Sequence, residues 1–228
     1  MGKKTLFFSN IIGDIMSNDI NSKFNDYMEE YLKKNINSDY SMIFIDAPGL
    51  GGEENYLPNI IRCFNRIGID FKSIIHVNSN TLRSNIDDFL LNNNKILYFL
   101  MGGNPYTQIE TIKRLNMIEE IKNHNDLVIG FCAGAINLSK YSILTSDEDF
   151  PEVDNYEGID REDICVEPHY NNPYDIKRNN ELQDFSNKLN TNIYCVPDKS
   201  IIYFENGIKT EKGIIYTVEK ENIWKNLQ

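Results

Sequence analysis

The sequence predicts an α/β fold in which a doubly wound, mostly parallel β-sheet carries helices on both of its faces. Short apolar runs recur along the chain, and amphipathic stretches with helical spacing lie between them. Strands and helices that alternate in this way form right-handed crossover units, whose parallel strands are buried on both sides. The expected strands are the runs 5–9, 42–46, 73–77, 96–100 and 127–130.

The expected helices each present one apolar face. In the stretch 21–35, Phe24, Met28 and Leu32 recur at the spacing that places side chains on one side of a helix. The stretches 56–67 and 82–91 repeat this pattern. These three helices are therefore predicted to cover the sheet.

The last quarter of the chain differs, because short strand-like runs follow one another there with turns between them. These runs are 192–196, 200–205, 207–210 and 213–218. The dipeptide Asn206-Gly207 is typical of a tight two-residue hairpin. We expect antiparallel C-terminal hairpins that extend the edge of the sheet, and a single domain over residues 1–228.

Composition narrows the classes of function. The formal net charge is −11 and the sequence pI is about 4.8, which disfavours binding to nucleic acid or to an anionic membrane surface. The apolar run near the N-terminus is too short for a secretory signal, so we expect a cytoplasmic protein. The four cysteines show no C-x-x-C spacing, which predicts neither a structural zinc site nor a disulfide framework.

A cysteine between an expected strand and an expected helix is the strongest candidate for a catalytic nucleophile. Residues 130–135 read G-F-C-A-G-A directly after the run 127–130. The pattern G-x-C-x-G is the cysteine form of a nucleophile elbow, in which the glycines avoid clashes and the helix N-terminus points at the nucleophile. Cys132 is the predicted nucleophile, and the N–H group of Ala133 is predicted to face an oxyanion.

A second strand ends in a glycine pair, Gly102-Gly103, after the run 96–100. Parallel strands bring their carboxyl ends to the same edge of a sheet, where ligands bind in open α/β folds. The backbone N–H of Gly103 is therefore a second candidate for the oxyanion hole.

A thiol nucleophile requires a base, and the sequence offers three histidines. His76 lies inside an apolar run, and His124 precedes the elbow strand and so lies at its wrong end. His169 follows a short strand-like run and precedes polar turn residues, which places it at the active edge and makes it the predicted base. For the acid that orients His169, the residues alone leave four candidates open, namely Asp147, Glu148, Asp149 and Glu167.

These segments resemble peptidase family S51, which contains aspartyl dipeptidase E and cyanophycinase. The elbow matches the family pattern G-x-S-A-G-A except at the nucleophile, and the glycine loop and the P-H-[FY] motif match at Gly102-Gly103-Asn104 and Pro168-His169-Tyr170. The resemblance implies a fold like that of class I glutamine amidotransferases. It selects Asp147, fifteen residues after Cys132, as the acid, with Glu167 as the alternative. It also implies that Asn104 and Arg178 bind substrate.

The chain departs from the family in two respects. Cysteine replaces the nucleophilic serine, and Glu181 stands where a second arginine would serve acidic substrates, so aspartyl specificity is not expected. We predict a hydrolase that cleaves a peptide or related amide bond through an acyl-enzyme, without metal or cofactor. A glutaminase or amidotransferase subunit is the first alternative, and a non-catalytic ligand-binding or redox-sensing module is the second. The expected partner is a small peptide or amide substrate, with no nucleic acid and no membrane, and a homodimer is compatible with the sequence.

Overall fold

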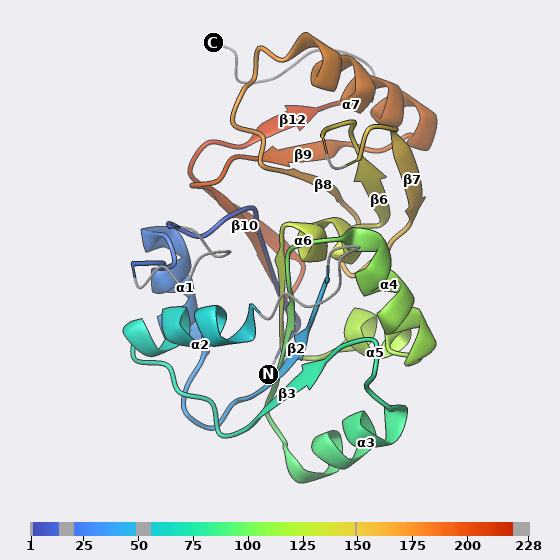
Figure 1. Cartoon of the computed structure of the whole chain (residues 1–228). Coiled ribbons are helices and arrows are strands. Elements are labelled where there is room, and N and C mark those ends of the chain that lie inside the picture. Colours follow the sequence, from blue (N-terminus) through green and yellow to red (C-terminus); the bar gives the residue numbers. More distant parts are fainter. Residues whose placement is uncertain (1, 14–20, 49–55, 149, 221–228) are drawn as a thin grey trace.

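A computed structural model describes residues 2–13, 21–48, 56–148 and 150–220, and its centre is a seven-stranded sheet (Figure 1). The strand order is β11-β10-β1-β5-β4-β2-β3. The five strands from β1 to β3 in this order pair in parallel, and β10 and β11 add an antiparallel edge. The strands are β1 (Lys4–Phe8), β2 (Ser41–Ile45), β3 (Ile74–Val77), β4 (Ile96–Leu100), β5 (Leu127–Phe131), β10 (Ile201–Glu205) and β11 (Ile208–Lys212).

Helices cover both faces of this sheet, as the sequence predicts (Figure 1). Alternate strand residues enter separate cores: Leu6 and Phe8 pack on the face of α1 and α2, whereas Phe7 packs on the opposite face. The helices are α1 (Asp26–Asn35), α2 (Leu57–Arg66), α3 (Arg83–Asn92), α4 (Pro105–Arg114), α5 (Ile118–Asn123), α6 (Ala133–Leu138) and α7 (Ile176–Leu189). The mixed α/β class with a mostly parallel sheet is confirmed.

The C-terminal strands confirm one part of the prediction and correct another. Asn206 and Gly207 have φ values of 53° and 80°, which close the expected β10–β11 hairpin. However, β9 (Ile193–Val196) and β12 (Tyr216–Val218) do not extend the main sheet. They form a second sheet of order β12-β9-β8 with β8 (Cys165–Pro168), and β9 runs parallel to β8.

The physical reason is a crossover that the sequence pattern does not reveal. Helix α7 connects β8 to β9, and its buried Leu182 and Phe185 pack against Cys165 and Ile193 of these strands. Packing in this small core stabilises the pairing of β9 with β8, so β9 does not join the main sheet. A short hairpin of β6 (Tyr141–Leu144) and β7 (Asp154–Glu157) lies beside it (Figure 1).

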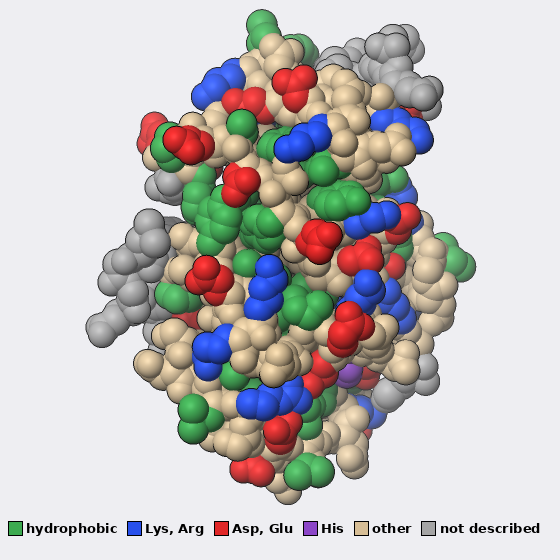
Figure 2. Space-filling view, turned by 90° about the vertical axis from the view of Figure 1, so that its right-hand side faces the viewer, with side chains coloured by type: hydrophobic (Ala, Val, Ile, Leu, Met, Phe, Trp, Pro, Cys, Tyr) green, Lys and Arg blue, Asp and Glu red, His purple; other side chains and the backbone are tan. Residues whose placement is uncertain are grey.

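The surface shows no segregation of charge on the face in Figure 2, where acidic and basic side chains are interspersed. Among the described residues, no helix is both long enough and apolar enough to span a membrane.

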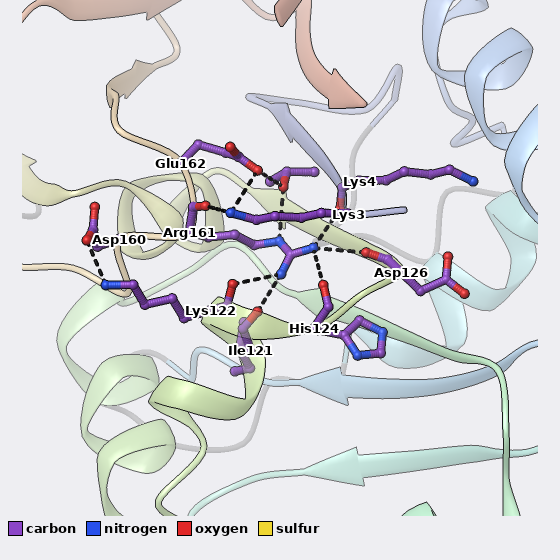
Figure 3. A network of polar contacts seen from close by, with 10 residues as sticks. Lys3, Lys4, Ile121, Lys122, His124, Asp126, Asp160, Arg161 and Glu162 are labelled. Carbon is purple, nitrogen blue, oxygen red and sulfur yellow. Dashed lines mark hydrogen bonds and ion pairs between the residues drawn. The ribbon is translucent and has the colours of Figure 1, made fainter. Parts of the chain in front are cut away.

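A buried arginine, Arg161, contacts the amino ends of two neighbouring strands, β1 and β5 (Figure 3). Arg161 is 1% exposed, and its guanidinium donates to the carbonyl oxygens of Lys4, the first residue of β1, and of Asp126, which directly precedes β5. It also donates to the carbonyl oxygens of Ile121 and His124 at the end of α5. Arg161 therefore joins two central strands to one covering helix.

Candidate active site

The turn after β5 places Cys132 at the carboxyl edge of the sheet. Its φ and ψ are 48° and −107°, a strained combination for a residue with a Cβ atom. The backbone N–H of Cys132 donates to the carbonyl oxygen of Phe8 (3.0 Å), which fixes the turn on the neighbouring strand. A Cβ atom at Gly134 would lie 2.2 Å from the carbonyl oxygen of Leu100, so the close approach of α6 to the sheet requires glycine. The turn therefore presents a partly exposed thiol.

His169, directly after β8, lies against Cys132. Its imidazole is hydrogen-bonded to the side chains of both Cys132 and Asp198. The distance from Nδ1 to Oδ1 of Asp198 is 2.7 Å. Burial alone would lower the pKa of this imidazole, but the two hydrogen bonds outweigh burial and raise the pKa of His169 to about 10. His169 is therefore protonated at neutral pH.

The other two histidines have structural partners far from the nucleophile. Nε2 of His76 lies 3.1 Å from Oδ2 of Asp46, and Nε2 of His124 lies 2.8 Å from the carbonyl oxygen of Ile96. The structure brings only His169 to Cys132.

The carboxylate that orients His169 belongs to Asp198, in the connection between β9 and β10. Its second oxygen, Oδ2, accepts from Nδ2 of Asn171 (2.8 Å) and from Nδ2 of Asn10 (3.3 Å). The backbone N–H of Asp198 donates to Oδ1 of Asn171 (3.0 Å), so the asparagine holds Asp198 at two points. Burial would raise the pKa of this carboxyl, but the hydrogen bonds from His169, Asn171 and Asn10 lower it. Asp198 is thus a fixed anion beside the imidazolium.

The structure contradicts the prediction that Asp147 is the acid that orients His169, because Asp198 occupies that position. Oδ1 of Asp147 accepts from the backbone N–H of Phe150 (2.6 Å), and the backbone N–H of Asp147 donates to the carbonyl oxygen of Phe150 (2.8 Å). Asp147 lines the cavity at Cys132 but is not the partner of His169. Glu148 lines the same cavity, and Asp149 lies outside the described residues. One signal could have indicated Asp198: it follows the expected strand 192–196 almost directly, at a carboxyl end.

The alternative acid, Glu167, also has partners other than His169. Its Oε1 accepts from Oγ1 of Thr145 (2.7 Å) and from Nε of Arg178 (2.6 Å). Burial raises the pKa of Glu167, and the contacts with Arg178 oppose this rise. Glu167 therefore anchors Arg178 and does not orient His169.

Arg178 supports the histidine loop. Its Nη1 donates to the carbonyl oxygen of His169 (3.0 Å), and its Nη2 donates to the carbonyl oxygen of Pro168 (2.7 Å). All three guanidinium nitrogens thus contact the protein, although Arg178 does line the cavity. Its predicted role as a ligand for an acidic substrate is replaced by a role in holding the chain around His169.

The two predicted oxyanion donors line the cavity beside Cys132. Neither the N–H of Gly103 nor that of Ala133 donates to another group in the parts of the chain that are described. Gly103 has a φ of 127°, and a Cβ atom there would lie 2.1 Å from the carbonyl oxygen of Ala47. Asn104, predicted to bind substrate, instead caps α4, since its Oδ1 accepts from the N–H groups of Tyr106 and Thr107.

Gly103→Ala is expected to lower kcat by about 100-fold for any amide or ester that the protein cleaves, because the clash with Ala47 displaces an oxyanion donor. Gly68→Ala is the matched control: Gly68 also has a positive φ of 78°, but a Cβ atom there meets nothing within 4 Å. Steady-state kinetics and thermal melts of both variants separate the two effects. Equal kcat values for the two variants would show that Gly103 is not part of the oxyanion hole.

A cavity of about 360 Å³ opens next to the thiol. Its lining includes Gly103, Cys132, Ala133 and His169, together with residues from β6, residues 145–148, Phe150 and residues at the start of α7. The cavity is large enough for one or two amino-acid side chains. Cys132, His169 and the two predicted oxyanion donors therefore line a single cavity.

Comparisons with known proteins concern the family and the fold of the chain. The model of peptidase family S51 matches residues 12–211. A crystal structure of a candidate peptidase E from Listeria monocytogenes EGD-e has a TM-score of 0.64 with 18% sequence identity, and the match covers 93% of this chain and 98% of that one. At this identity the likeness establishes a shared fold. No curated protein matches the chain.

Proposed function

Because the chain belongs to peptidase family S51, we propose that it hydrolyses a peptide or related amide bond through an acyl-enzyme on Cys132. The observation that carries this proposal is the series Cys132–His169–Asp198, whose first two members line a single cavity. Replacement of serine by cysteine is compatible with the mechanism, since a thiolate is an intrinsically strong nucleophile.

In the first half of the reaction, the sulfur of Cys132 attacks the carbonyl carbon of the scissile bond. The resulting oxyanion accepts hydrogen bonds from the N–H groups of Gly103 and Ala133. His169 is already protonated at neutral pH, and so it can give its proton to the leaving amine as the C–N bond breaks. The products of this half are a thioester on Cys132 and a free amine.

In the second half, the neutral imidazole of His169 takes a proton from water, and the oxygen of that water attacks the thioester carbonyl. The C–S bond breaks, the carboxylic acid leaves, and the sulfur of Cys132 is set free while His169 keeps the proton taken from water, which restores the protonated histidine of the starting state. Asp198 holds the ring in place and stabilises its positive charge in both halves.

Trapping of the intermediate tests the proposal. We expect that mixing the protein with an activated ester, such as p-nitrophenyl acetate, and quenching in acid will yield an acetyl group on the peptide that contains Cys132. The other cysteines serve as internal controls, because Cys63, Cys165 and Cys195 are buried and burial raises the pKa of each thiol. Mass spectrometry of the digested protein locates the adduct.

Cys132→Ala should form no adduct and should not turn over a peptide or amide found by screening. If Cys132→Ala cleaved such a substrate as fast as the wild type, the assignment of the nucleophile would be wrong. The same assays with glutamine as substrate would detect a glutaminase by release of ammonia.

A further inference from the structure

A second cavity, of about 870 Å³, adjoins Asp198. Its walls come from the start of α1, from the connection between β9 and β10, and from the connection that leads into β12 (Figure 1). Among the described residues, none lines both this second cavity and the cavity at Cys132. Asp198 and Asn171 line the second cavity, so a ligand there lies beside the acid of the candidate site and not beside its nucleophile.

The wall of the second cavity carries large apolar side chains that the fold leaves open to solvent. Ile12, Tyr27 and Ile214 are 41%, 41% and 62% exposed, and all three line it. Tyr216, the first residue of β12, adds a further aromatic ring. Apolar side chains that gather around one hollow indicate a surface for an apolar ligand, because filling the hollow removes each of them from water.

Asn25, directly before α1, is an independent observation that points to a hydrogen-bond acceptor in the ligand. The residue is 5% exposed and lines the second cavity. Its Oδ1 accepts from the backbone N–H of Met28 (3.0 Å), which fixes the orientation of the amide, since Nδ2 can only donate. Nδ2 is buried and has no hydrogen-bond partner in the described part of the chain. A buried donor without a partner is costly, so an acceptor oxygen that reaches Nδ2 recovers this cost.

The charges around the second cavity select the kind of acceptor. The charged side chains in its described lining are those of Asp26, Asp198 and Lys199. A carboxylate ligand would therefore face two acids and one base, whereas an uncharged carbonyl oxygen accepts from Nδ2 of Asn25 without net repulsion. An uncharged amide with an apolar side chain next to it combines both requirements, and it is the repeating unit of an apolar peptide.

We propose that the second cavity binds a short apolar peptide, one of whose backbone carbonyl oxygens accepts a hydrogen bond from Nδ2 of Asn25. An apolar side chain of the peptide packs between Tyr27 and Ile214, which line the same cavity. The bound peptide adjoins Asp198, whose carboxylate orients His169. The proposal does not depend on the proposed function, because neither Cys132 nor His169 lines the second cavity in the described part of the chain.

Titration of the ¹⁵N-labelled protein with N-acetyl-phenylalaninamide tests the proposal by NMR. The full chain carries Cys132→Ala, so that no probe is cleaved. We expect the side-chain amide signal of Asn25 and the backbone signals of Tyr27 and Ile214 to shift together and to saturate. N-acetyl-phenylalanine, which ends in a carboxylate, should bind about tenfold more weakly. Shifts confined to Ala133 and Ile136, which line the cavity at Cys132, or tighter binding of the carboxylate, would overturn the proposal.

Asn25→Ser removes the donor and keeps the helix cap, because a serine hydroxyl also accepts from the N–H of Met28. The variant should bind N-acetyl-phenylalaninamide about tenfold more weakly than the protein with Asn25. Thermal melts of the two proteins show whether the cap is intact. Equal affinity of the two would show that Nδ2 does not contact the ligand and would contradict the proposal.

Ile214→Ser tests the apolar wall at a position whose exposure makes unfolding of the variant improbable. It should weaken binding of the same probe about tenfold, because the phenyl ring loses an apolar contact. Ile208→Ser is the matched control: Ile208 is 72% exposed on β11 and does not line the second cavity. The same affinity in both serine variants would count against the second cavity as the binding site, even if Asn25→Ser failed to fold.

Discussion

Asp198→Asn is expected to lower kcat/KM by about 10³-fold, by analogy with the loss of the orienting carboxylate in other triads. The amide keeps the size of the side chain but removes the charge that stabilises the imidazolium of His169, whose Nδ1 lies 2.7 Å from the carboxylate. Without that charge, His169 gives up its proton at a lower pH and is less well oriented toward Cys132. Steady-state kinetics with a substrate from the peptide screen measure this loss.

The pKa of His169 provides a second measurement for the same variant. NMR titration should give about 10 for the wild type and a lower value for Asp198→Asn. Since the pKa is raised on folding from an ordinary value of 6.5, the pair stabilises the fold fully below pH 6.5, and this stabilisation is lost as the pH rises through about 10. Asp198→Asn should therefore lower Tm more at pH 6 than above pH 10.

Asp147→Asn is the comparison that decides between the two carboxylates. Because Asp147 accepts from Phe150 and not from His169, its replacement should leave the pKa of His169 close to that of the wild type. A fall in that pKa with Asp147→Asn, and none with Asp198→Asn, would restore the assignment made from the sequence.

Arg161→Met is expected to cost about 3–5 kcal/mol of unfolding free energy. The variant keeps the volume of the side chain, but the carbonyl oxygens of Lys4, Ile121, His124 and Asp126 lose the guanidinium as a donor (Figure 3). For a chain of this length such a loss lowers Tm by roughly 10 °C. Urea denaturation followed by circular dichroism measures the change.

Two further variants serve as comparisons for the stability of Arg161→Met. Arg161→Lys retains the charge but cannot contact several carbonyl groups at once, so it should recover only part of the stability. Arg66→Met, on the exposed surface of α2, makes the same change of side chain and should shift the free energy by less than about 0.5 kcal/mol. Equal stability of Arg161→Met and Arg66→Met would show that the buried network contributes nothing.

Local patterns in the sequence were sufficient to predict the parallel strands of the main sheet and those residues of the candidate site that directly follow a strand. Apolar runs and helical spacing predict the five parallel strands and the helices on both faces, because each element needs only its own residues to show which side is buried. The turn at Cys132, the glycine pair at Gly103 and the position of His169 are likewise local, since each directly follows a strand. The structure brings these residues to one cavity.

The partner of His169 depends on contacts between distant segments. Asp198 reaches the imidazole because β9 pairs in parallel with β8, and that pairing is stabilised by α7 against a core of its own. No periodicity in the sequence distinguishes this crossover from a plain antiparallel extension of the sheet. For the same reason, nothing local indicates that Arg178 holds the histidine loop or that Arg161 joins two strands to a helix.

The sequence by itself therefore determined the fold class and the family, and it indicated Cys132 as the candidate nucleophile, because these depend on patterns that lie within a few consecutive residues. Only the tertiary structure decided which carboxylate orients His169 and which charges line the cavity. Hydrogen bonds and ion pairs depend on distances of about 3 Å between side chains, and those distances are set by the packing of segments far apart in the chain.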